Sequence, residues 1–185
     1  MSAFYLTLIA VLLSGLGGRD QLTLAALTRR QGPRIGVIAT ACVLAICTSA
    51  FAAYAASRML TILPLQARPI LEAIALAFAG LESLILSPKA DPREPTRSLG
   101  ALALVLLAHQ LTDAARFTLF GLAVGTGSPL AAGLGGGLAS LVLSFTAIAF
   151  AHRVGMRDLR ITRRVIGGLL LAIAVAMFLH VRGLL

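Results

Sequence analysis

The sequence predicts an all-α polytopic membrane protein of six transmembrane helices, arranged as two inverted repeats of three helices. Of its 185 residues, 58% are hydrophobic and 12% are charged, whereas a soluble domain keeps roughly 25% charged residues on its wetted surface. Apolar runs of about 20 residues recur along the chain, and each is long enough to cross the hydrocarbon core of a bilayer. Together they use most of the length, which leaves no room for a separate soluble domain.

Proline, glycine and charged segments separate the apolar runs. The predicted spans cover residues 3–28, 35–57, 66–86, 99–124, 129–151 and 163–182. The one clear polar linker, at 87–97, divides the chain into repeats at 1–86 and 98–185. Because each repeat holds an odd number of spans, the second enters the membrane in the opposite direction to the first. In transporters, such inverted repeats place the binding site near the bilayer midplane.

The basic residues predict the orientation of the spans. The net charge of +9 comes mostly from arginines between spans, so it does not indicate nucleic-acid binding. Eleven of the sixteen basic residues fall in loops one, three and five: Arg29, Arg30, Arg34, Lys89, Arg93, Arg97, Arg153, Arg157, Arg160, Arg163 and Arg164. The positive-inside rule places these loops in the cytoplasm and both termini on the opposite side. The Arg-rich composition, nearly free of Lys, favours a bacterial inner membrane.

The two halves share a weak internal similarity at an offset of about 95 residues. Residues 12–24, LLSGLGGRDQLTL, align with residues 107–119, LAHQLTDAARFTL, and both segments place polar and charged side chains at the same depth of a first span. Lipid-facing helices do not require this, because a charge at the bilayer centre costs about 2.5–3.5 kcal/mol and usually marks function. The candidate pathway residues are Arg19, Asp20, Gln21, His109, Gln110, Thr112, Asp113 and Arg116.

Two interpretations of these side chains stay open. His109, Asp113 and Arg116 follow one another by four and three residues, so they would share one face of a continuous helix. That face could hold an ion or pass a proton. Alternatively, Asp113 pairs with Arg116, Arg19 pairs with a neighbouring helix, and the neutral cluster only locks helices together. Glu82 lies near one end of the third span, where water or lipid headgroups can reach it, and its role stays undecided.

The glycines of spans one and five also have two interpretations. Close packing of helix backbones is the simpler one for residues 15–18 and 133–137. For residues 15–18 the alternative is a loosened helix whose freed carbonyls line the site.

The same segments resemble the E-x-G-D-[KR]-[ST] motifs of the Golgi and bacterial manganese/calcium cation–proton exchangers, in the lysine-exporter superfamily. The first window keeps Gly17, the basic Arg19 and the trailing Gln21, with Gly15 and Gly18 at the acidic positions. In the second window Asp113 is kept, while Gln110 stands at the other acidic position and Ala114 at the basic one. The resemblance implies six spans in two inverted triplets.

The resemblance also implies a secondary transporter that exchanges a divalent cation for protons by alternating access. Asp113 and Asp20 would be the ligands of a transported Mn²⁺ or Ca²⁺, Gln110 and Thr112 would assist, and Arg19 with Arg116 would set the local charge. We expect no resident cofactor and no enzymatic activity.

Two other functions remain open. One is a non-transporting scaffold or partner protein with the same fold. The other is an exporter of a small organic solute, because a carboxylate beside an arginine can hold a zwitterion. The expected partners are the lipid bilayer and a transported ion or small solute, with a homodimer as an open option and no nucleic acid.

Overall fold

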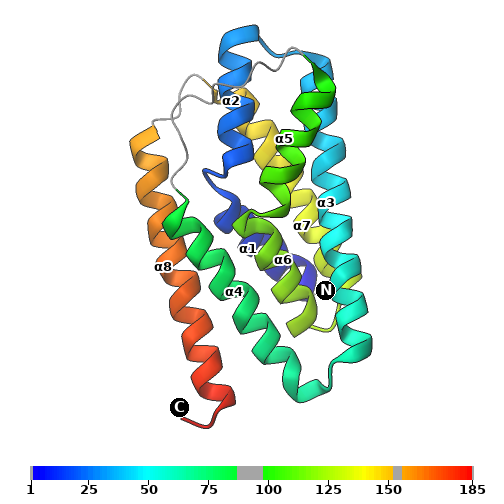
Figure 1. The fold of residues 1–185 in the computed structure, drawn as a ribbon, viewed down its shortest axis with the longest axis vertical. Helices are drawn as coiled ribbons and strands as arrows, with labels where there is room; N and C mark the ends of the chain where they lie inside the picture. The colour runs from blue at the N-terminus through cyan, green and yellow to red at the C-terminus, as the bar shows by residue number, and fades with distance from the viewer. Residues whose placement is uncertain (1, 87–97, 152–155, 185) are drawn as a thin grey trace.

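The computed structural model describes residues 2–86, 98–151 and 156–184, and within these ranges the chain is helical (Figure 1). Its α-helices are α1 (Ser2–Gly15), α2 (Arg19–Gln31), α3 (Ile35–Ile62), α4 (Arg68–Ile85), α5 (Leu99–Leu111), α6 (Ala114–Gly125), α7 (Pro129–Ala149) and α8 (Met156–Val181). A short 3₁₀ turn, η1 (Leu65–Ala67), precedes α4. The all-α prediction is confirmed. The predicted linker at 87–97 lies outside the described residues.

In the described parts of the chain, three helices are long and apolar enough to cross a membrane, and they lie in α3, α7 and α8. A fourth span results when α1 and α2 count as one. Large apolar side chains such as Leu130, 77% exposed, and Ile62, 72% exposed, cover the outside of the bundle. A monomeric soluble protein rarely exposes so much apolar surface. The prediction of a membrane protein built from apolar helices is therefore supported by the length and composition of these helices.

The first and fourth predicted spans are each broken into two helices, which agrees with the loosened helix considered for residues 15–18, whereas the continuous helix assumed for His109, Asp113 and Arg116 was wrong. α1 and α2 meet at a 61° bend, where Gly17 adopts a φ of 72° that ends α1. α5 ends at Leu111, and Asp113 is the N-cap of α6, its carboxylate accepting the Ala115 N–H at 3.4 Å. The N-caps of α2 and α6, Gly18 and Asp113, lie 95 residues apart, which is the offset of the internal similarity.

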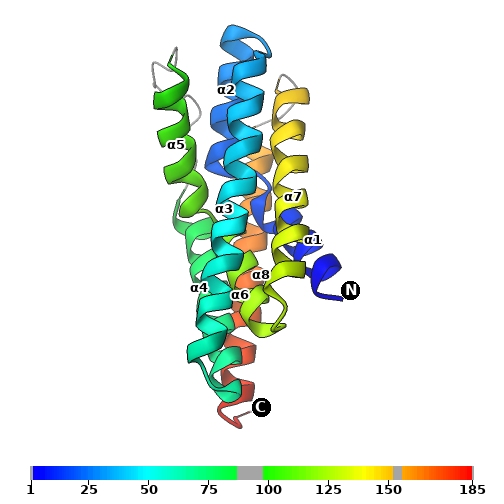
Figure 2. The ribbon, with the colours of Figure 1, turned by 90° about the vertical axis from the view of Figure 1, so that its right-hand side faces the viewer.

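The two broken helices run in opposite directions (Figure 1). α1 and α2 lead towards the end of the bundle where α3 begins, whereas α5 starts at that end and α6 leads away from it. α7 packs between α1 and α3, and α6 packs against α1, α3 and α4 (Figures 1 and 2). α8 packs chiefly along α4. This arrangement brings both breaks to the middle of the bundle.

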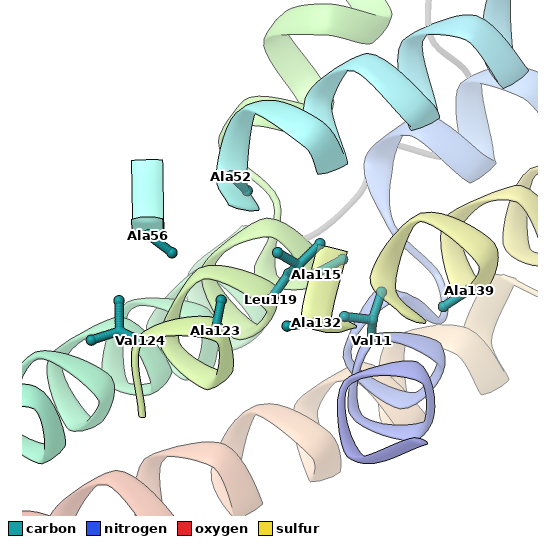
Figure 3. Close-up of a cluster of buried hydrophobic side chains, with 9 residues drawn as sticks. All are labelled: Val11, Ala52, Ala56, Ala115, Leu119, Ala123, Val124, Ala132 and Ala139. Carbon is teal, nitrogen blue, oxygen red and sulfur yellow. The ribbon is translucent and has the colours of Figure 1, made fainter. Parts of the chain in front are cut away.

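Small side chains allow these helices to pack closely. The central apolar cluster consists of Val11, Ala52, Ala56, Ala115, Leu119, Ala123, Val124, Ala132 and Ala139 (Figure 3). On α7, a Cβ added to Gly135 would overlap the Phe4 carbonyl, and one added to Gly136 would overlap the Leu119 side chain. Close packing is thus confirmed for these two glycines of the 133–137 segment.

The remaining helix boundaries agree with the predicted spans to within a few residues, except in α8. This helix begins at Met156, seven residues before the predicted start of the sixth span. Arg160, Arg163 and Arg164 were predicted to be loop residues, and all three are helical. That correction matters for the site, because one of these arginines lies at the centre of the bundle.

Candidate functional site

Six charged side chains gather where the two helix breaks meet. They come from α2, α4, the N-terminus of α6 and α8, and they are Arg19, Asp20, Glu82, Asp113, Arg116 and Arg163. We call this set the central charge cluster. Its three carboxylates and three guanidinium groups sum to zero charge when all are ionised.

Arg163 is the most deeply buried member of the cluster, with 2% of its surface exposed. Its Nη2 contacts Glu82 Oε2 and donates to Asp113 Oδ1 at 3.2 Å. Asp113 therefore pairs with Arg163 on α8, and the predicted pair with Arg116 is wrong. Glu82 is 7% exposed and belongs to the cluster. Burial of Glu82 and Asp113 is tolerable because each of these two carboxylates has a cationic partner.

Arg116 binds hydroxyl groups of two other helices. Its Nε donates to Thr48 Oγ1 at 2.9 Å, and its Nη1 donates to Ser140 Oγ at 2.7 Å. Thr48 lies 3.0 Å from Gln110 Oε1, and Gln110 Nε2 donates to Asp20 Oδ2 at 3.4 Å. A chain of hydrogen bonds thus leads from α6 through α3 and α5 to α2. It links both helix breaks to the sides of the bundle.

The first break is tied directly to the second by Arg19. Its Nη2 donates to the Thr112 carbonyl at 3.2 Å and to Thr112 Oγ1 at 2.8 Å, and its Nε lies 3.5 Å from Glu82 Oε1. Gln21 Oε1 accepts the Gly17 N–H at 3.0 Å, which satisfies a backbone donor freed by the break. The predicted pair between Arg19 and a neighbouring helix is therefore present, with Glu82 of α4.

His109 takes a different place from the one predicted. It lies on α5, whereas Asp113 and Arg116 follow the break, so the three side chains do not share the face of one continuous helix. His109 Nδ1 lies 3.5 Å from Thr23 Oγ1 of α2. The interruption at Thr112 changes the helix axis and phase between these residues.

A small polar cavity of about 10 Å³ lies beside the cluster and is bordered by both breaks. Its lining includes Asp20, Gln110, Asp113 and Arg116. A water molecule needs a volume on the order of 10–15 Å³, so this cavity is about the size of one water molecule or a bare ion. Two larger cavities, of about 550 and 310 Å³, have mostly apolar linings, although Thr48 and Arg116 also border the smaller of the two.

Within the described ranges, no group of three or more His, Cys, Asp or Glu side chains could hold a metal ion. Asp20 and Asp113 border the same cavity, and this proximity is what a shared cation would need. Their role as ligands of a transported metal stays a prediction.

Sequence reasoning missed Arg163, Thr48 and Ser140 and left Glu82 undecided. A signal for Arg163 was present, because it is in phase with Gly167, Leu170 and Ala174, which are the buried residues of α8 further along. An arginine at the start of an apolar helical stripe can therefore belong to the core. Thr48 and Ser140 carried no such signal, since hydroxyl residues are common in membrane helices.

The fold and this cluster define the class: a helical membrane protein with a buried, charge-balanced polar centre. No family model, curated protein or solved structure matches the chain.

Proposed function

We propose that the protein is a secondary transporter that exchanges a small inorganic cation for protons by alternating access. The observation that carries this proposal is the meeting of two broken helices, of opposite direction, around one cavity bordered by Asp20 and Asp113. Transporters with inverted repeats use discontinuous helices in this way, since unwound backbone and helix ends can bind ions at the midplane. The degenerate exchanger motifs lie at the same two breaks.

Six spans in two inverted repeats follow if α1–α2 and α5–α6 each count as one broken span and α4 as another. The opposite directions of the two broken helices and the 95-residue spacing of their N-caps support this count. The basic end of the bundle, where α2 ends and α3 begins, would face the cytoplasm of a bacterium. Both termini would then lie on the other side of the inner membrane.

The size and chemistry of the cavity favour an inorganic cation as cargo. The volume of about 10 Å³ matches an ion in size, which favours an inorganic cation over the organic-solute alternative. Mn²⁺ and Ca²⁺ bind carboxylate, amide and hydroxyl oxygens, and Asp113, Asp20, Gln110 and Thr112 supply such groups at the breaks. Because the cluster is neutral, a cation enters only as carboxylate pairs with arginine rearrange. The same carboxylates can take up protons when the cation leaves.

One observation favours the scaffold alternative. The three carboxylates all have arginine or amide partners, from α5 or α8 or, for Glu82, from both α2 and α8. A cluster of this kind can hold helices together without transport. A transporter produces a measurable cation flux across the membrane, and a scaffold does not.

The test is transport in proteoliposomes with an imposed pH gradient and an entrapped indicator for Mn²⁺ or Ca²⁺. We expect wild type to carry one of these cations and Asp113→Asn to lose at least tenfold in rate. Glu72→Gln is the matched control, because it removes a half-buried carboxylate of α4 that lies outside the cluster. Equal rates for wild type and Asp113→Asn would remove Asp113 from the mechanism, and no cation flux in wild type would favour the scaffold.

A further inference from the structure

α4 and α8 approach each other closely just beside the central charge cluster. A Cβ added to Gly80 would lie 2.8 Å from the Gly167 carbonyl, and one added to Gly167 would lie 2.9 Å from the Gly80 carbonyl. These two glycines let the backbones touch. Glu82 follows Gly80 by two residues, and Arg163 precedes Gly167 by one helical turn. The close approach is thus what allows Arg163 to reach across to Glu82.

The guanidinium of Arg163 is only partly used in this position. One nitrogen, Nη2, contacts both Glu82 Oε2 and Asp113 Oδ1. Arg163 Nε and Nη1 are buried without a hydrogen-bond partner in the described structure, and so is Glu82 Oε1. An arginine whose role is only structural would favour two parallel hydrogen bonds to one carboxylate. Buried donors left unsatisfied are costly, so this contact is poorly suited to be permanent.

The charges around Arg163 match a divalent cation better than an arginine. Glu82 and Asp113 carry two negative charges, the single Arg163 nitrogen between them carries part of one positive charge, and Arg19 Nε lies 3.5 Å from the other Glu82 oxygen. An ion of charge +2 in that place would neutralise both carboxylates. Both carboxylates face the same nitrogen, and hard cations such as Mn²⁺ bind carboxylate oxygens.

We propose that Arg163 is a tethered cation that occupies a latent divalent-cation site formed by Glu82 and Asp113. This inference rests on the proposed function and adds how access to the site is regulated. α8 holds the site closed, and withdrawal of its first turns from α4 opens the site to cargo. Arg163 then competes with the transported ion for the same two carboxylates. Cargo binding and the position of α8 are thereby coupled.

The experiment measures Mn²⁺ binding by electron paramagnetic resonance to the purified full chain in detergent. Arg163→Gln is expected to bind Mn²⁺ at least tenfold more tightly than wild type. Arg160→Gln is the matched control, because it removes the same charge from an exposed position one turn earlier on α8. The double variant Arg163→Gln with Asp113→Asn is expected to lose the gain. Equal affinities of Arg163→Gln and Arg160→Gln would overturn the proposal.

Arg163→Lys covers the case in which Arg163→Gln does not fold. A lysine keeps the positive charge, but it is strongly hydrated and lacks the fork of the guanidinium. Mn²⁺ should displace it more easily, with an affinity at least threefold above that of wild type. An unchanged affinity in folded Arg163→Lys would also contradict a tethered cation.

The binding assay separates this inference from the transport function. If wild type carries a cation but the Arg163 variants bind Mn²⁺ no more tightly, the transport function is supported and the proposal that Arg163 is a tethered cation is contradicted. A gain of binding without flux in any variant would support the latent site and contradict transport.

Discussion

The two helix breaks occupy equivalent positions in the two halves of the chain, but different chemical groups form them. The break between α1 and α2 is made by backbone: Gly17 takes a positive φ, and Gly18 caps α2 without a side chain. The break between α5 and α6 is made by side chains, with Asp113 as the cap of α6. One break therefore supplies a bend, and the other supplies a buried charge. Similar geometry does not require similar chemistry.

The breaks also satisfy their freed backbone groups in different ways. Each backbone N–H or C=O group left without a hydrogen bond in the hydrocarbon core of a membrane costs on the order of several kcal/mol. At the first break, the Gly18 N–H donates to the Gly15 carbonyl at 3.0 Å, and Gln21 accepts from Gly17. At the second, the Asp113 carboxylate accepts from Ala115 while also pairing with Arg163. Loss of Asp113 should therefore cost more than any change at the first break.

Asp113→Ala should have the largest effect on stability. It removes a helix cap and leaves Arg163 with one carboxylate fewer, so we expect the free energy of unfolding to fall by about 3–5 kcal/mol. Reversible unfolding in mixed SDS micelles measures this change. Asp113→Asn keeps an oxygen that can cap α6, and its loss should be smaller. Equal losses would mean that the cap contributes nothing and the charge everything.

Gly17→Ala should have an intermediate effect. An alanine at φ 72° is strained by roughly 1–2 kcal/mol, and the same unfolding assay would show this loss. Gly168→Ala is the control, because Gly168 lies within α8 with open space around it. That change should leave stability unchanged or raise it, since alanine favours a helix more than glycine does. Equal effects at the two glycines would show that the bend is not held by backbone conformation.

Gln21→Ala should have the smallest effect of the three. It removes the side-chain acceptor of the Gly17 N–H, and a hydrogen bond of this kind contributes about 0.5–1.5 kcal/mol. Gln66→Ala, at an exposed position in η1, is expected to change nothing in the same assay. A larger loss for Gln21→Ala than for Gly17→Ala would reverse the ranking and make the side chain the main support of the first break.

Much of the architecture could be predicted from hydropathy, but the breaks could not. Span lengths and the 95-residue offset are properties of sequence alone. The kink at Gly17 depends on a single backbone angle, and glycine is equally suited to close packing, as Gly135 and Gly136 show. The loosened-helix interpretation of residues 15–18 was open for that reason. The role of Asp113 as a helix cap could not be predicted, because an aspartate inside a span can equally be an ion-pair partner within a continuous helix.

The site was predictable to the extent that its residues were charged and inside a span. Asp20, Gln110, Asp113 and Arg116 all border one cavity. Arg163 was assigned to a loop because an arginine-rich segment before an apolar run is typical of a cytoplasmic end. Its burial depends on α4 lying alongside, and a contact between residues 81 positions apart leaves no local pattern. Thr48 and Ser140 became part of the site for the same reason.

The order in which the polypeptide is made has a consequence for the central charge cluster. The side-chain contacts of Arg163 with Glu82 and Asp113 join α8 to helices that precede it in the chain. Until α8 arrives, the other five side chains carry two positive and three negative charges. A nascent chain stalled before that point holds an excess negative charge in the lipid phase. Only α8 completes a centre that the bilayer tolerates, so chains truncated before α8 should be substrates for membrane proteases.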